Sequence, residues 1–63
     1  MGMTPKAARV NAGLTQSVAA DRLDISKTSL QNYENYRTVP SVTMAKKMAR
    51  LYGLSVDDIE FTK

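Results

Sequence analysis

Four polar residues, spaced so that they share one face of a helix, offer the clearest hydrogen-bonding chemistry in this sequence. They are Lys27, Thr28, Gln31 and Asn32, within the segment SKTSLQNYE. Residues four positions apart, such as Lys27 and Gln31 or Thr28 and Asn32, lie on the same side of a helix, and these four present an ammonium group, a hydroxyl and two amides. The face is either an ordinary solvated surface or a surface that binds a polar partner. The residues alone leave both interpretations open.

Catalytic and metal-binding chemistry is poorly represented. The 63 residues include no Cys and no His, which removes disulfides, thiolates, imidazole acid/base chemistry and the usual transition-metal ligands. The six Asp and Glu residues show neither the spacing of a calcium loop nor a paired acid site. We therefore expect no enzyme activity and no cofactor, metal or small-molecule ligand.

The charge is unevenly distributed along the chain. Residues 1–50 carry eight Lys and Arg against three Asp and Glu, whereas residues 51–63 carry one Lys against three acids. A basic body suits an anionic partner such as nucleic acid, although it also serves solubility. No apolar run approaches the roughly 20 residues of a membrane span, and the N-terminus lacks the apolar core of a signal peptide. We expect a soluble, cytoplasmic protein without membrane contact.

Helix signals dominate the chain, and strand signals are almost absent. Capping residues and helix-ending glycines predict five helices: residues 5–12, a second to residue 23, 27–35, a longest one that ends at Gly53, and a short one through residue 59 or 61. The expected N-caps are Thr4, Thr15, Ser26, Ser41 and Ser55. Because no repeat or linker interrupts the pattern, we expect residues 1–63 to form one all-α domain.

The corner between the second and third expected helices is a sharp turn. Asp24 falls where the chain must reverse, and Asp is one of the few residues other than Gly that tolerate the left-handed conformation. Ala20 is small enough to let the two helices approach closely. Two helices joined by such a short turn form a helix-turn-helix, in which the first helix braces the second for insertion into a DNA major groove.

A longer pattern extends in order over nearly the whole chain. It comprises Gly13-Leu14-Thr15-Gln16, Ala20, Leu23, Ile25-Ser26, Leu30, Glu34-Asn35, Pro40-Ser41 and Gly53-Leu54-Ser55-Val56-Asp57. This pattern resembles the phage repressor and Cro type of helix-turn-helix domain. The resemblance implies a compact five-helix, lambda-repressor-like fold. It also implies a transcriptional regulator that binds a double-stranded DNA operator as a dimer, near the nucleoid of a bacterial host.

The resemblance implies base contacts for the polar face. Lys27, Thr28 and Asn32 match base-contacting positions, and Gln31 lies next to them as a fourth candidate for a base or a phosphate. Lys donates to guanine, Asn pairs with adenine, and Thr bonds to either kind of base or touches the methyl group of thymine.

Other residues match positions that contact the DNA backbone. Gln16, the first residue of the second expected helix, matches such a position, and Arg37 follows the third helix where a basic backbone contact is common. We expect Asn35 to take the left-handed conformation that usually ends the third helix, which leaves Tyr36 free to lie against sugar and phosphate or to cover the core.

Arg9 and Glu34 match a different kind of position. In some members of the family these residues form a partly buried ion pair that ties the first helix to the end of the third. The resemblance therefore implies a structural pair that orients the third helix without touching bases.

The C-terminal apolar residues raise the question of a dimer. We expect Leu54, Val56 and Ile59 to cap the core, and Phe61, with Leu51 or Met44, to face a partner in a weak homodimer that tightens on DNA. The same fold also serves protein-interaction modules such as antitoxins or antirepressor-like factors. That alternative stays open at the level of sequence.

Overall fold

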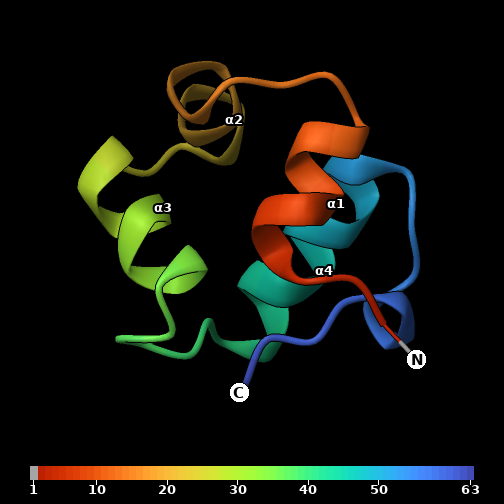
Figure 1. Ribbon diagram of the computed structural model, residues 1–63. Coiled ribbons are helices and arrows are strands. Elements are labelled where there is room, and N and C mark those ends of the chain that lie inside the picture. Colours follow the sequence, from red (N-terminus) through yellow and green to blue (C-terminus); the bar gives the residue numbers. More distant parts are fainter. Residues whose placement is uncertain (1) are drawn as a thin grey trace.

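A computed structural model describes residues 2–63, and Met1, the first residue of the expected domain, lies outside them. The described residues form four α-helices and one turn of 3₁₀ helix (Figure 1). The α-helices are α1 (Pro5–Asn11), α2 (Gln16–Leu23), α3 (Lys27–Glu34) and α4 (Val42–Tyr52), followed by the 3₁₀ turn η1 (Val56–Asp58). The all-helical prediction is confirmed for this part of the chain. None of its helices is both long enough and apolar enough to cross a membrane.

Each α-helix begins at the capping residue that the sequence predicts. The side chains of Thr4, Thr15, Ser26 and Ser41 each accept a hydrogen bond from the backbone N–H three residues later, at 3.0–3.2 Å. Such a cap satisfies one of the N–H groups that a helix start leaves without a partner. Helix α4 ends at Gly53, whose φ of 74° lies in the left-handed region that favours glycine.

The prediction of a fifth helix is wrong, because only a short 3₁₀ turn forms at this place. The reciprocal capping bonds between Ser55 and Asp58 are present, with Ser55 N–H donating to Asp58 Oδ2 at 3.1 Å, but only one 3₁₀ turn follows. The chain then extends at Ile59 (φ −120°, ψ 130°) and forms a parallel bridge with Met3. Two hydrogen bonds of 2.8 Å hold this bridge, from Met3 N–H to Asp58 O and from Glu60 N–H to Met3 O. Pairing with the N-terminal segment therefore replaces further helical bonds.

A small apolar core lies where the helices meet. Its fully covered members include Leu23, Leu30 and Met48, and Ala8 and Ala19 allow close approach between helices. Figure 1 shows α2 and α3 on one side of this core, with α1 and α4 on the other. Helix α3 lies at the edge of the molecule, so one of its faces packs on the core and the opposite face is open.

Tyr52 occupies an unusual place in this core. The residue is 5% exposed, and its hydroxyl group has no hydrogen-bond partner among residues 2–63. Burial, and secondarily the negative charge of Glu34, raises the pKa of Tyr52 to about 12 from 10.0, against an opposing effect of Arg9. Because the folded-state pKa is the higher one, the stability that this group contributes is fully present below pH 10. It is lost as the pH rises from 10 to 12.

Replacing Tyr52 with Phe is therefore expected to leave stability at pH 7 unchanged or slightly higher, since the hydroxyl group has no partner to lose. Between pH 10 and 12 the free energy of unfolding should fall less steeply for Tyr52→Phe than for the wild type. Urea titrations at stepped pH measure both effects, and Tyr33→Phe is the matched control, expected to retain the steeper fall. Identical pH profiles of stability for the wild type and Tyr52→Phe would contradict the raised pKa of Tyr52.

Candidate nucleic-acid interface

The corner between α2 and α3 has the geometry of a tight helix-turn-helix. Asp24 adopts the left-handed conformation, with φ 59° and ψ 42°, as expected from its position. The N–H of Ile25 donates to the carbonyl of Ala20 at 3.0 Å, which closes the end of α2. Ala20 is 3% exposed, so the small side chain lies in the contact between the helices. The turn thus holds α3 firmly against α2.

The four polar residues lie on the open face of α3. Lys27 and Thr28 are exposed at its N-terminal end, and Gln31 and Asn32 are half-buried one turn later. On the opposite face, Leu30 is fully buried. The side chain of Asn32 makes no hydrogen bond within residues 2–63, so its amide is available to a partner. The structure therefore brings all four sequence candidates together on one surface.

A buried ion pair lies beneath this surface. Arg9 Nε donates to Glu34 Oε2 at 2.7 Å, and Arg9 also donates to the carbonyl of Leu14 at 2.7 Å. Arg9 and Glu34 are 7% and 8% exposed. The pair joins α1, the loop after it and the end of α3, and it touches no exposed base-contacting candidate directly.

Gln16 connects the ion pair to the surface. Its Nε2 donates to Glu34 Oε1 at 3.1 Å, and its Oε1 accepts from Gln31 Nε2 at 3.2 Å. This connection was not predicted from the sequence, because 15 residues separate Gln16 from Gln31 and no local pattern brings them together. Gln16 also lies at the N-terminal end of α2, where unpaired N–H groups and the helix dipole favour an anion.

The end of α3 differs from expectation. The prediction that Asn35 takes the left-handed conformation is wrong, since Asn35 has φ −93° and ψ 7° and its N–H still bonds to the carbonyl of Gln31 at 2.9 Å. The reversal falls one residue later, at Tyr36, with φ 60°. The N–H of Arg37 then closes the turn on the carbonyl of Asn32 at 2.9 Å. Tyr36 is half-buried and Arg37 is exposed.

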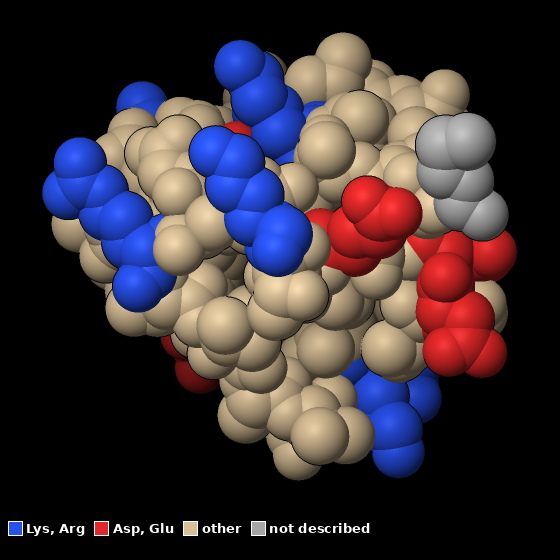
Figure 2. Space-filling model, turned by 60° about the horizontal axis from the view of Figure 1, so that its bottom comes forward, with Lys and Arg blue, Asp and Glu red and all other residues tan. Residues whose placement is uncertain are grey.

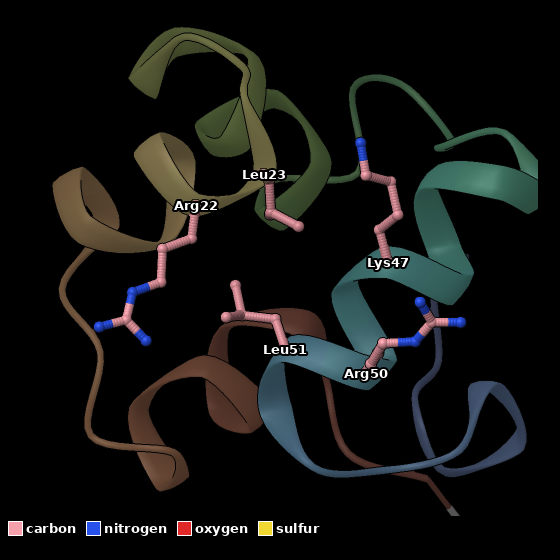
Figure 3. Close-up of a pocket in the computed structure, with 5 residues that line it drawn as sticks. All are labelled: Arg22, Leu23, Lys47, Arg50 and Leu51. Atoms are coloured by element: carbon pink, nitrogen blue, oxygen red, sulfur yellow. The ribbon is translucent and has the colours of Figure 1, made fainter.

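Basic side chains also surround a groove between α2 and α4 that was not predicted from the sequence. The groove has a volume of about 320 Å³ and is lined by Arg22, Leu23, Lys47, Arg50 and Leu51. Figure 3 shows Leu51 pointing toward Leu23, with Arg22 on one side and Lys47 and Arg50 on the other. In Figure 2, Lys and Arg dominate one side of the face shown and Asp and Glu gather toward the other. The charge asymmetry of the sequence thus becomes an asymmetry of the surface.

The three residues expected at a dimer surface are only partly exposed. Phe61, Leu51 and Met44 are half-buried and pack against the apolar core. Of the three residues expected to cap the core, Ile59 is 5% exposed, while Leu54 and Val56 are half-buried.

The α2–turn–α3 unit, with a polar open face on α3, defines a helix-turn-helix protein. Residues 6–59 match the helix-turn-helix family, and the chain belongs to it; the resemblance inferred from the sequence is confirmed. The chain is 39% identical over 57 residues to the HTH-type transcriptional regulator ImmR of Bacillus subtilis (strain 168). The match covers 90% of this chain and 45% of that relative, so the chain spans less than half the relative's length. No solved structure matches it significantly.

Proposed function

We propose that residues 1–63 form the DNA-binding domain of a transcriptional regulator, which acts by binding and not by catalysis. The observation that carries the proposal is the open face of α3, where Lys27, Thr28, Gln31 and Asn32 present donors and acceptors from a helix braced by α2. Base edges in the major groove are recognised by such side chains. The family and the name of the relative support the same function.

Backbone contacts are proposed for three further residues. Gln16 has one Nε2 hydrogen left after its bond to Glu34, and Arg37 and Tyr36 follow α3 directly. N–H groups and cations near the recognition helix bind phosphate and so fix its position on the duplex. The net charge of +3 favours the same partner, and it makes the binding sensitive to salt.

We further propose that the chain binds an operator as a Cro-like weak dimer, with Phe61, Leu51 and Met44 at the contact. One copy of the domain offers few base-contacting side chains, each worth about 1–3 kcal/mol of discrimination. A dimer doubles their number. Half-burial of these three apolar residues leaves part of each available to a second copy. Occupation of the operator would then block or bias polymerase.

Selection from a random duplex library at near-physiological salt tests this function. We expect an enriched inverted repeat whose half-sites are about 34 Å apart, one helical turn of DNA, and sedimentation of two chains per enriched duplex. The matched control is a variant with Lys27, Thr28 and Asn32 replaced by Ala, which should keep its helical circular dichroism and lose the enrichment.

A second candidate function is the binding of a protein partner, such as that of an antitoxin or antirepressor-like factor. The groove between α2 and α4 favours it, because an apolar floor flanked by Arg22, Lys47 and Arg50 matches an acidic segment that carries an apolar side chain. The same selection separates the two functions. No enriched sequence, together with DNA affinity that does not fall with salt, would contradict the DNA-binding proposal and favour the protein partner.

A further inference from the structure

The groove between α2 and α4 combines an apolar floor with three cations at its rim (Figure 3). Its volume of about 320 Å³ lies at the lower end of the range for ligand-binding clefts, roughly 300–1,000 Å³. Leu23 belongs to the core and is 2% exposed, whereas Leu51 is only half-buried. Leu51 and the methylene stems of the neighbouring cations therefore form the apolar surface that a bound group can cover.

The three cations are Arg22, Lys47 and Arg50, and none of them forms an ion pair among residues 2–63, where Arg9–Glu34 is the one salt bridge. Arg22 and Arg50 lie in the last turns of α2 and α4, where the helix dipole favours a positive charge. That effect does not account for Lys47 in the middle of α4, or for an apolar floor between the cations. Three unpaired like charges around one groove repel one another, and bound carboxylates relieve that repulsion.

The chemistry of the groove distinguishes between two kinds of anionic occupant. A DNA backbone offers phosphate oxygens to the cations, but charged phosphates do not cover Leu51 with apolar surface. An acidic protein segment satisfies both needs, because its carboxylates reach the rim and an apolar side chain between them covers Leu51. No lining residue lies on α3, and none is a residue proposed to contact DNA. Charge and apolar surface together therefore favour an acidic protein segment.

We propose that the groove docks an acidic segment of a partner protein, which covers Leu51 and so competes with the second copy of this chain. The inference rests on the proposed function, in which Leu51, with Phe61 and Met44, contacts that copy. Occupation of the groove leaves the open face of α3 exposed, so one domain still contacts one half-site. Because it removes Leu51 from the dimer contact, it weakens the dimeric complex with the operator without any change at the bases.

A labelled synthetic peptide, in which pairs of glutamates alternate with single leucines, tests the docking without DNA. Fluorescence anisotropy is expected to show saturable binding that weakens with salt, because salt screens exposed charges. The groove variant Arg22→Gln/Lys47→Gln/Arg50→Gln should lose about 3- to 150-fold in affinity, the combined effect of three exposed ion pairs. Replacing the leucines of the peptide with serine should cost at least about 10-fold, since burying one such side chain contributes that much.

The matched control removes the same total charge at exposed positions that do not line the groove. It is Lys6→Gln/Lys46→Gln/Lys63→Gln, and it should keep the wild-type affinity for the peptide. Circular dichroism checks that both triple variants remain helical. An equal loss in both variants would overturn the docking site, because net charge alone would then attract the peptide. Full affinity for the serine peptide would overturn the apolar contact with Leu51.

Sedimentation of the free protein separates an acidic partner from a second copy as the occupant. If the peptide does not bind, and the wild type self-associates while the groove variant does not, a second copy occupies the groove and the acidic partner is overturned. Displacement of the peptide by a scrambled duplex would also overturn the proposal, because the groove would then bind phosphate.

The competition with the second copy is measured on the enriched duplex. Saturating peptide is expected to reduce the sedimenting complex from two chains per duplex to one, whereas the groove variant should keep two chains in the presence of peptide. Two wild-type chains per duplex with the peptide still bound would overturn the competition, while the docking site stands. If no sequence is enriched, the proposed function fails, and the peptide assay without DNA still decides the docking.

Discussion

Glu34→Gln is expected to lower the free energy of unfolding by about 3 kcal/mol, the loss that follows when one partner of a buried ion pair is removed. The bond from Arg9 Nε to Glu34 Oε2 is 2.7 Å long, and the two side chains are 9% and 2% exposed. The variant leaves the Arg9 charge in a site that water hardly reaches. A chain of this length has roughly 3–9 kcal/mol of stability in all, so the expected loss is about a third of that total or more.

A double-mutant cycle measures the coupling between the two residues. Arg9→Met alone should destabilise by a similar amount, and the Arg9→Met/Glu34→Gln pair should cost less than the sum of the single changes, because no charge is stranded. Urea titrations at low temperature, where the single variants stay measurable, give the four free energies. Lys46→Met, on an exposed position of α4, is the control and should change stability by less than about 0.5 kcal/mol. A coupling energy near zero would contradict a structural role for the pair.

Asn32→Ala is expected to have the largest effect on DNA binding. Its amide has no partner within residues 2–63, so it is free to pair with adenine through two hydrogen bonds worth about 1–3 kcal/mol. On an inverted repeat both half-sites lose the contact, and the total of about 2–6 kcal/mol corresponds to roughly 30- to 20,000-fold in affinity. Fluorescence anisotropy with the enriched duplex measures this loss.

The control for Asn32→Ala removes the same amide group from another helix. Asn11→Ala removes an exposed amide at the end of α1 and should leave affinity unchanged. A base contact also predicts that Asn32→Ala tolerates all four bases at one position of the half-site. An equal loss of affinity on scrambled DNA would show instead that Asn32 contacts the backbone.

The helices and their caps could be predicted from the sequence because the forces that begin and end a helix are local. Each cap bond joins residues three apart, and apolar spacing indicates which face of α3 is buried. The left-handed Asp24 was predictable for the same reason, since few residues tolerate that conformation. The four polar residues of α3 follow from periodicity alone once the buried face is known.

The two errors arose where distant segments decide the local structure. The capping bonds of Ser55 and Asp58 form, yet the helix they predict stops after one turn, because Ile59 pairs with Met3 from the other end of the chain. The turn after α3 was placed on Asn35 by residue preference, whereas continued helical bonding moves it to Tyr36 at φ 60°. A bulky residue in that conformation is rare, so preference could not have indicated it.

The amino-acid sequence by itself determined the helical class, the positions of the caps, the tight corner and the polar face of α3, since all of these depend on residues within a few positions of one another. Only the tertiary structure decided how the amides on that face are oriented. Arg9, Glu34, Gln16 and Gln31 come from three helices, and their hydrogen bonds exist only once packing brings those helices together. The direction of each hydrogen bond depends on the side chain that lies opposite the amide. The fold determines which side chain that is.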